Sequence, residues 1–382
     1  MKIAILKEEK NEYRVSLVPT DVKTLIAAKH EIVITKGAGD NAGFTDHEYL
    51  EVGAKVLNNN KETIGNSNLI LKLSKPTNAE IKCISPNQIL VSIFNLANNP
   101  KVLFKLMKTK ITTLGIEAIQ DDGVFSLIIP NEQIKGRFGV LLGAYNLSKM
   151  VKDGLGKTFA SLTHNKDKAQ FTILNASYAG LEAAKTVLGL GANLTVLEND
   201  DHLVKQIKDD THLHTLAKLN SCKFEVKKAD FTDLSNIVIN TDVLINTNSV
   251  PGSLTAKRIT QKMVSTMKHG SVIVDLAIDQ GVTADTETKP STFKKPYYIV
   301  EGVKHFAIEN IPSLFANSIS VAISTILTEK FLKHLKGENA LMTIKDNKIL
   351  LNAIITYNGE LTNKIVADAL HIQNKNISSL IK

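Results

Sequence analysis

The chain has 382 residues, of which 43% are hydrophobic and 22% charged, and its formal net charge is +8. This length exceeds the about 250–300 residues at which a single hydrophobic core stops growing, so we expect two domains. Lysines are scattered along the chain without a long basic run, which argues against a nucleic-acid partner. The ordinary composition predicts a soluble globular protein without a membrane partner.

The N-terminus and the two cysteines indicate the cellular compartment in which the protein is expected. The apolar run after Met1 is shorter than the roughly 7–15 residues of a signal-peptide core, so we interpret it as a first strand. Cys83 and Cys222 lie far apart and without a His/Cys cluster, so we expect neither a disulfide framework nor a metal site. These features favour a cytoplasmic protein.

Short apolar runs alternate with amphipathic helical patterns through the first part of the chain, which predicts a mostly parallel sheet. The expected strands are Lys2–Leu6, Glu31–Thr35, Asn68–Leu73 and Ile89–Phe94, and the expected helices include Asp21–Lys29 and Pro100–Lys108.

A long helical pattern, Glu132–Val151, connects this block to a second alternating block. The strands of the second block are continuously apolar, as in a sheet that is covered on both faces. Further helices are expected at Ser318–Leu335 and Asn363–Leu370. The expected strands are Phe171–Leu174, Leu194–Glu198, Val243–Asn246 and Ser271–Leu276.

The second block begins with the strand–helix–strand pattern of a dinucleotide-binding unit. Its second strand ends at Glu198, where an acidic side chain can accept hydrogen bonds from the adenosine ribose, which favours NAD over a 2′-phosphorylated cofactor. We therefore expect NAD, held by Glu198 and by the loop residues Ala176, Ser177, Tyr178, Ala179 and Gly180.

This loop departs from the usual Gly-x-Gly-x-x-Gly pattern. It has Asn175 and Ser177 at the first two glycine positions and keeps only Gly180, the glycine that permits close packing of helix on strand. Asn tolerates a left-handed conformation, and Ser is small and can donate a hydrogen bond to phosphate. We expect weakened dinucleotide binding; the alternative is a doubly wound sheet that has lost its ligand.

Several motifs spread over the chain carry a family likeness. They are Lys7–Pro19, Gly37–Gly39 followed by Gly43–Asp46, the segment Met267–Gly281, and the tail Leu351–His371. Together they resemble the alanine dehydrogenase family, which includes the NAD(P) transhydrogenase α subunit. The Ile-Asp-Gln-Gly ending of the third motif resembles alanine dehydrogenase rather than transhydrogenase, so the chain is identified as a divergent member of that family.

The resemblance implies an α/β fold with two doubly wound domains. A Rossmann-type NAD-binding domain, residues 131–305, is inserted into a discontinuous substrate domain, residues 1–130 and 306–382. It also implies NAD-dependent oxidation of L-alanine with water to pyruvate and ammonia, and a homo-oligomer, in the family a hexamer. We expect the two long helices, Glu132–Val151 and Ser318–Leu335, to form the contacts between subunits. For Glu132–Val151 the alternative is burial between the two domains of one chain.

The resemblance also assigns site residues. Arg14 matches the family's substrate arginine, and its planar guanidinium suits bidentate binding of a carboxylate. Asp279 matches the active-site aspartate that lies close to the nicotinamide and the substrate. Val250 and Asn310 fall in further family motifs and are expected to contact the cofactor.

At two positions where the family has catalytic residues, this sequence has different ones. The family's Lys-Val-Lys-Glu-Pro becomes Lys-Leu-Ser-Lys-Pro at residues 72–76, so Ser74 stands in place of the substrate lysine. The displaced Lys75 points to the other face of a strand unless a bulge re-aims it. Asn95 replaces the catalytic histidine, and an amide cannot exchange a proton near neutral pH. We keep Lys72 and Ser74 as substrate-site candidates, and Lys75 and Asn95 as catalytic candidates.

Three hypotheses follow. The first is an NAD-dependent oxidoreductase of alanine or a related small amino or keto acid, with Arg14 as the carboxylate clamp and Asp279 near hydride transfer. In the second, the protein has impaired catalysis and retains the fold as a binding or regulatory protein, which Ser74 and Asn95 favour. The third is a changed reaction within the family, such as reductive condensation of an amino acid with a keto acid.

Overall fold

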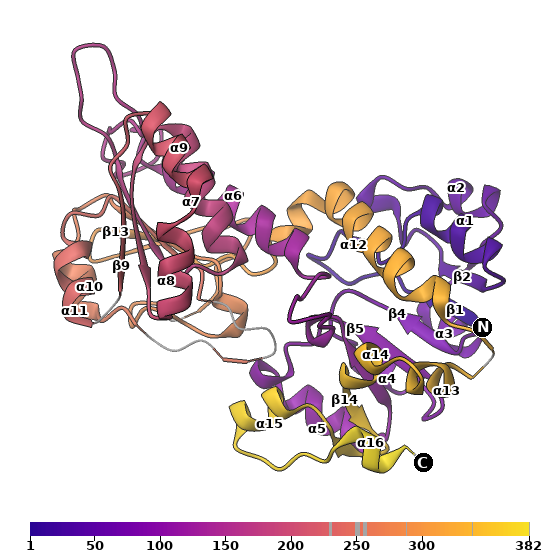
Figure 1. Ribbon diagram of the computed structural model, residues 1–382. Coiled ribbons are helices and arrows are strands. Elements are labelled where there is room, and N and C mark those ends of the chain that lie inside the picture. Colours follow the sequence, from indigo (N-terminus) through magenta and orange to yellow (C-terminus); the bar gives the residue numbers. More distant parts are fainter. Residues whose placement is uncertain (229–230, 249–252, 255–257, 288, 338, 382) are drawn as a thin grey trace. The chain divides into compact units, whose positions relative to one another are not determined.

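The computed structural model describes residues 1–228, 231–248, 253–254, 258–287, 289–337 and 339–381. The chain forms two compact units, the first from residues 1–130 and 312–382 and the second from most of residues 131–311 (Figure 1). The chain re-enters the first unit at Pro312, whereas the sequence analysis placed this boundary at residues 305/306. The predicted α/β class is confirmed, because each unit is built on one largely parallel sheet.

The first unit contains an eight-stranded sheet in the order β15-β14-β6-β5-β4-β1-β2-β3. From β1 the strands progress through β2 and β3 on one side and through β4, β5 and β6 on the other, all in parallel, while β14 and β15 are antiparallel additions. The bounds are β1 Lys2–Ile5, β2 Glu31–Thr35, β3 Lys55–Leu57, β4 Leu69–Leu71, β5 Ile89–Ser92, β6 Thr112–Gly115, β14 Ile354–Tyr357 and β15 Glu360–Leu361.

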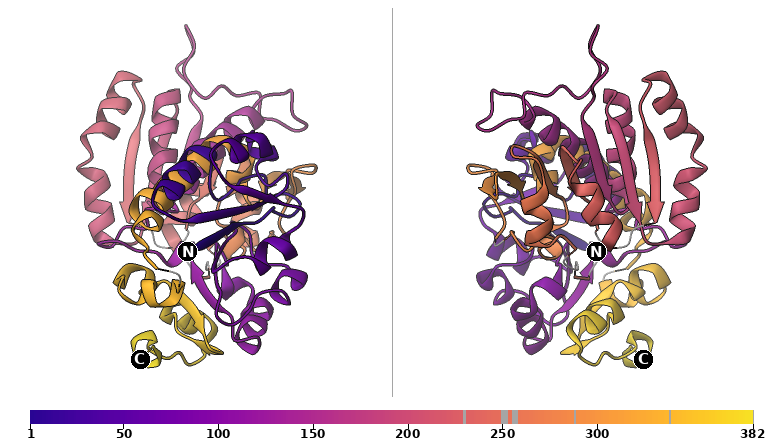
Figure 2. Two further views of the ribbon diagram at one scale, coloured as in Figure 1. Left: turned by 90° about the vertical axis from the view of Figure 1, so that its right-hand side faces the viewer. Right: turned by 90° about the vertical axis from the view of Figure 1, so that its left-hand side faces the viewer.

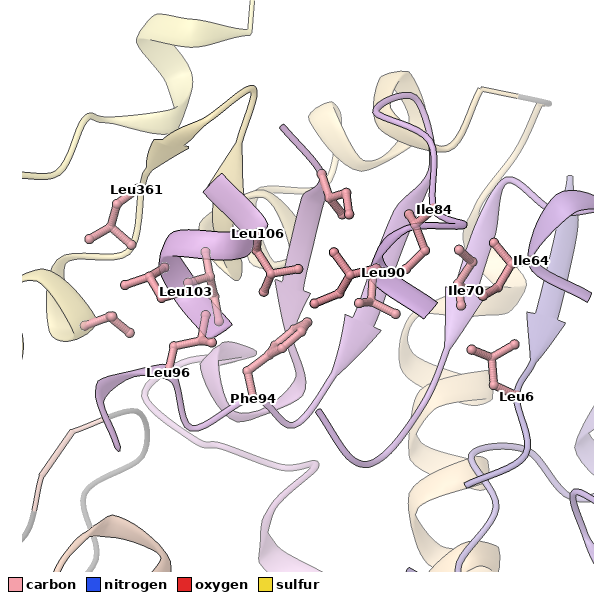
Figure 3. Close-up of a cluster of buried hydrophobic side chains, with 14 of the residues drawn as sticks. Leu6, Ile64, Ile70, Ile84, Leu90, Phe94, Leu96, Leu103, Leu106 and Leu361 are labelled. Carbon is pink, nitrogen blue, oxygen red and sulfur yellow. The ribbon is translucent and has the colours of Figure 1, made fainter. Parts of the chain in front are cut away.

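An apolar core on one face of this sheet joins strands, helix α5 and the C-terminal segment (Figure 3). Leu90 of β5, Leu103 and Leu106 of α5, and Leu361 of β15 are at most 1% exposed there. The helices of the unit are α1 Pro19–Ala27, α2 Asp46–Glu51, α3 Asn60–Gly65, α4 Asn78–Ile81, α5 Pro100–Lys108, α12 Ala316–Lys330, α13 Ala340–Lys345, α14 Lys348–Asn352, α15 Lys364–Leu370 and α16 Ile377–Leu380.

Helix α12 belongs to the segment Ile311–His334, the one stretch among the described residues that is long and apolar enough for a membrane span by length and composition. More than half of its most apolar window, 56%, is buried. The hydroxyl groups of Ser320 and Ser324 accept hydrogen bonds from the backbone of Val15 and Val18, and Ser324 donates to Asp21. These contacts make α12 a core helix of the first unit.

The second unit contains a seven-stranded sheet in the order β12-β13-β11-β10-β7-β8-β9, in which only β12 pairs antiparallel. Helices lie on both sides of this sheet (Figures 1 and 2). The progression β7-β8-β9 on one side and β10-β11-β13 on the other is the doubly wound order of dinucleotide-binding sheets. The bounds are β7 Gln170–Leu174, β8 Asn193–Glu198, β9 Phe224–Lys228, β10 Val243–Asn246, β11 Val272–Asp275, β12 Tyr298–Val300 and β13 Val303–Phe306.

Helix α6 lies very close to its neighbours in the second unit. A Cβ atom at Gly136 would fall 2.2 Å from the carbonyl oxygen of Ala179, and one at Gly143 would fall 2.5 Å from Val243. Glycine is therefore required where α6 crosses α7 and approaches β10. The helices are α6 Ile129–Asn146, α7 Tyr178–Leu190, α8 Asp201–Lys208, α9 Thr211–Leu219, α10 Phe231–Val238 and α11 Gln261–Thr266.

Candidate functional site

In both units the strand order reverses at one point, between β1 and β4 in the first and between β7 and β10 in the second. Ligands of doubly wound sheets bind in the crevice outside the carboxyl ends of the strands at this switch point. Glu8 follows β1, Ser74 follows β4, Asn95 follows β5 and Glu117 follows β6, so the first unit gathers these side chains at one edge.

Arg14 is held by a neighbouring carboxylate. Its Nε and Nη2 atoms donate to the two oxygens of Glu12 at 2.8 and 2.6 Å, and both side chains are 4% exposed. Because a guanidinium has two forked edges, the Glu12 contact orients the group and engages only the Nε–Nη2 edge.

Lys72 is fully buried and forms ion pairs with Glu80 at 3.1 Å and Glu8 at 3.5 Å. Burial opposes its charge, but attraction by Glu8 and then Glu80 raises the pKa of the ammonium. Lys72, predicted to bind substrate, therefore forms part of a buried charge cluster.

Ser74 and Lys75 point to different partners. The hydroxyl of Ser74 donates to Glu8 Oε2 at 2.5 Å, and the Leu73 amide donates to Glu8 Oε1. Lys75 is exposed and donates to Asn99 at 2.8 Å. Burial raises the pKa of Glu8, against the lowering influence of Lys72. The Lys75 side chain is therefore not turned to the face on which the Ser74 side chain lies.

Asn95 lies on a turn that a buried carboxylate fixes. Its backbone is left-handed, with φ of 47°, and Glu117 Oε1 accepts the amides of Phe94 and Asn95 at 2.9 and 3.0 Å. Burial raises the pKa of Glu117 to about 7, against these hydrogen bonds. A buried carboxyl group with a raised pKa therefore lies directly beside Asn95, a catalytic candidate of the sequence analysis.

The loop after β7 has the shape that the dinucleotide motif needs. Asn175 is left-handed, with φ of 71°, and Ser177 caps α7 by accepting from the Gly180 amide. A Cβ atom at Gly180 would fall 2.3 Å from the Asn175 carbonyl oxygen and 2.7 Å from Thr247 Oγ1. Ala176, Ala179 and Gly180 are buried, and Tyr178 is 37% exposed.

Glu198 ends β8 as predicted, but its carboxylate turns toward backbone amides. Oε2 accepts from Ala176 at 2.7 Å, and Oε1 accepts from Asn199 and Asp200 at 2.6 and 3.0 Å. The side chain is 3% exposed. Of about four lone-pair positions on a carboxylate, three are engaged by backbone amides.

The remaining predicted site residues follow β11 and β13. Asp279 lies in the turn Ile278–Gln280, with its carboxylate 4.0 Å from Lys135 Nζ, and Lys135 also pairs with Glu132 at 2.7 Å. Asn310 is left-handed, with φ of 58°. Val250 lies outside the described residues.

Sequence reasoning did not single out Glu8 or Glu117. The signal for Glu8 was available, because it follows an apolar strand. Glu117 was missed because its strand, β6, reads Thr-Thr-Leu-Gly and lacks an apolar run. Cys83 and Cys222 are both free, and no cluster of metal-binding side chains occurs in the part of the chain that the structure describes.

Comparisons with known proteins agree with this arrangement. The model of the alanine dehydrogenase/PNT N-terminal domain matches residues 4–130, and that of the C-terminal domain matches residues 139–364. An alanine dehydrogenase of Staphylococcus saprophyticus is 32% identical over the full length of both chains. That of Methanococcus maripaludis is 32% identical over 97% of this chain and 96% of its own.

Solved structures show the same fold. An L-alanine dehydrogenase superposes with a TM-score of 0.83 at 25% identity, covering 97% of this chain and 99% of its own. A transhydrogenase from Sinorhizobium meliloti superposes with a TM-score of 0.72 at 21% identity, covering 95% and 99%, which indicates shared fold alone. The chain belongs to the alanine dehydrogenase/PNT family and is an alanine dehydrogenase-like oxidoreductase.

Proposed function

We propose that the protein is an NAD-dependent dehydrogenase of alanine or a closely related small amino or keto acid. The observation that carries the proposal is the full-length match to alanine dehydrogenases, with Arg14 and Asp279 kept in the family motifs. The substrate belongs at the carboxyl edge of the first sheet, and the dinucleotide at that of the second.

The loop after β7 fits a dinucleotide. The left-handed Asn175 takes the place of the first glycine, and Gly180 permits the close helix–strand packing that the motif needs. The amides of Ala176 and Gly180 donate to Glu198 and Ser177, so those of residues 177–179 would hold the pyrophosphate at the start of α7. Glu198 would accept a ribose hydroxyl on its remaining lone pair. When bound, the nicotinamide accepts a hydride from the substrate's α-carbon.

Arg14 would bind the substrate carboxylate. Glu12 accepts from Nε and Nη2 and so fixes the orientation of the guanidinium in advance. A cation that is oriented in advance binds a carboxylate at lower entropic cost than a mobile lysine.

Proton transfer cannot use Ser74 or Asn95, because neither titrates near neutral pH. Two carboxyl groups with raised pKa values lie beside these positions, Glu8 hydrogen-bonded to Ser74 and Glu117 hydrogen-bonded to the Asn95 backbone. Their presence supports a site that still exchanges protons.

A second candidate is a ligand-binding protein with little or no turnover. The exchange of two polar catalytic residues favours it, since a missing general acid or base commonly costs about 10²–10⁴-fold in rate. Catalysis on a larger amino or keto acid is a variant of the first proposal that the same exchange would permit.

Alanine-dependent reduction of NAD, followed by absorbance, tests the proposal. We expect slow turnover in the wild type and at least about tenfold faster turnover in the double variant Ser74→Lys/Asn95→His, which restores the family's groups. Lys75→Met is the control, and its rate should match the wild type because its ammonium is exposed and donates to Asn99. No gain in the double variant while NADH still binds would contradict alanine as the substrate.

We also propose a homo-oligomer in the cytoplasm. Helix α6 keeps Leu141 and Tyr145 about half exposed, at 50% and 56%, within the second unit. Residues four apart lie on the same face of a helix, so Leu141 and Tyr145 are neighbours, and contiguous exposed apolar side chains mark interaction sites. Two free cysteines suit a reducing compartment.

A further inference from the structure

A buried lysine of helix α6 lies beside Asp279 in the second unit. The Nζ atom of Lys135 is 2.7 Å from Glu132 Oε1 and 4.0 Å from Asp279 Oδ1. The side chains of Lys135 and Glu132 are 10% and 9% exposed, and that of Asp279 is 30% exposed. The ammonium therefore lies between two carboxylates, of which Asp279 is the more exposed.

The packing of α6 holds this ammonium in place. A Cβ atom at Gly139 would fall 3.0 Å from the Leu276 side chain, so the helix touches the chain directly after β11. Lys135 lies four residues before Gly139, and residues four apart share one face of a helix. The side chain of Lys135 is therefore directed toward the same segment, in which Asp279 follows Leu276.

A second lysine–glutamate pair of this unit provides a comparison. Lys185 and Glu182 of α7 have the same spacing in the sequence, and their ion pair is 2.9 Å long. The Lys185 side chain is 40% exposed, against 10% for Lys135. Burial of an ammonium costs free energy unless carboxylates compensate for the lost water. A pair of this spacing forms in solvent, so helix stability alone does not account for the burial of Lys135.

The turn with Asp279 lies at the edge of the sheet where the dinucleotide is expected. Strand β11 ends at Asp275, and Ile278–Gln280 forms the turn beyond its carboxyl end. Helix α6 also touches the start of α7, because Gly136 lies against the carbonyl group of Ala179. Ligands of doubly wound sheets bind outside the carboxyl ends of the strands. The three side chains therefore belong to the part of the unit in which the cofactor is expected.

We propose that Lys135 is a positioning residue that holds the turn carrying Asp279 and offsets the charge of its carboxylate beside the nicotinamide. The identity of this ligand rests on the proposed function. The offset has a direct consequence, because the nicotinamide ring is a cation in NAD⁺ and neutral in NADH. An Asp279 carboxylate without its lysine would attract the oxidised ring more strongly, whereas the neutral ring would not be attracted in this way.

The affinities for NAD⁺ and for NADH, measured by thermal-shift titration, test this consequence. We expect Lys135→Met to raise the ratio of NAD⁺ affinity to NADH affinity by about threefold or more. Glu132→Gln/Lys135→Met, the pair variant, should give the same rise, and it leaves no buried glutamate without its lysine if the single variant fails to fold. Lys135→Arg keeps the cation and should keep the wild-type ratio.

Two further comparisons separate a role through Asp279 from a structural role. In an Asp279→Asn background the pair variant should leave the ratio unchanged, because no carboxylate remains at position 279. Lys185→Met is the matched control on α7 and should keep the wild-type ratio. A rise that persists without the Asp279 carboxylate, or an equal weakening of both cofactors in both Lys135 variants, would overturn the proposal.

Amide hydrogen exchange tests the positioning without a cofactor. The amides of Gln280 and Gly281 donate to carbonyl groups of the same turn at 2.8 and 3.2 Å, so their protection reports on its order. We expect the pair variant and Asp279→Asn each to lower this protection by about two- to fivefold, and their combination to lower it no further. Unchanged protection in the pair variant would overturn the proposal, whereas no binding of either cofactor by the wild type would count against the proposed function alone.

Discussion

Buried carboxylates outnumber the cations that they contact at the edge of the first sheet. Three carboxylates, Glu8, Glu12 and Glu80, share this buried region with two cations, Lys72 and Arg14. A lysine at position 74 would make the number of cations equal to the number of carboxylates, whereas Ser74 supplies only a hydroxyl hydrogen bond. The excess negative charge is consistent with the raised pKa of Glu8, for which burial is the main cause.

Lys72→Met tests whether this lysine is a structural ion-pair residue. Removing one partner of a buried ion pair costs about 3–5 kcal/mol, so we expect a loss of that size in the free energy of unfolding measured with urea. Lys75→Met, on an exposed side chain three residues along, should change stability by less than about 0.5 kcal/mol. Equal small losses in both variants would contradict the structural role.

Glu117→Gln tests the buried carboxyl group beside Asn95. Its pKa is about 7 in the folded chain against 4.5 for the ordinary group, so its stabilising contribution is complete below pH 4.5 and is lost as pH rises to about 7. The unfolding free energy of the wild type minus that of the variant should fall by about 2–3 kcal/mol between about pH 5 and pH 8. A difference that is constant with pH would show that Glu117 is ionised throughout this range.

The bounds of helices and strands were predicted well where the hydrophobic pattern of the sequence was long and unbroken. Strands β2 and β10 and helix α5 have the predicted bounds, and α6 and α12 deviate only at their ends. Strand β9 was missed because it lies at a sheet edge and buries no residue fully. The hairpin β14–β15 was also missed, although Asn358-Gly359, both with positive φ, is the usual two-residue hairpin turn.

The candidate site was predictable only in part. Motif matching singled out Arg14 and Asp279, which lie between β1 and α1 and after β11, but the partners of Lys72 and Glu198 depend on which carboxylates and amides the tertiary fold brings near. The spacing of residues along the sequence does not show which side chains and amides become neighbours in the folded chain. The roles of these residues in catalysis stay predictions.

Two glycines of helix α7 provide a matched pair for the close helix–strand packing. Gly180→Ala would place a Cβ atom 2.3 Å from the Asn175 carbonyl oxygen, and such overpacking costs about 1–3 kcal/mol. Gly189→Ala meets no atom within 4 Å and should stabilise the helix by about 0.5–1 kcal/mol. Thermal unfolding of both variants measures the contrast, and similar effects at the two positions would count against the packing argument.

For the whole molecule, the half-exposed apolar side of α6 predicts self-association. Light scattering at micromolar concentration should give a particle several times the 41.8 kDa chain mass. Leu141→Asp should reduce that mass, whereas Leu219→Asp, on the more exposed apolar residue of α9, should leave it unchanged. A wild-type particle of one chain mass would contradict the assembly.

The central claim is that this family member still binds a nicotinamide dinucleotide despite its altered phosphate loop. A thermal-shift titration with NADH tests it most directly, since a ligand that binds only the folded chain must raise the melting temperature with concentration. We predict a rise that follows NADH concentration in the wild type and is smaller in Gly180→Ala, compared with each protein's own melting temperature without ligand. An unchanged melting temperature at saturating NADH would contradict the claim.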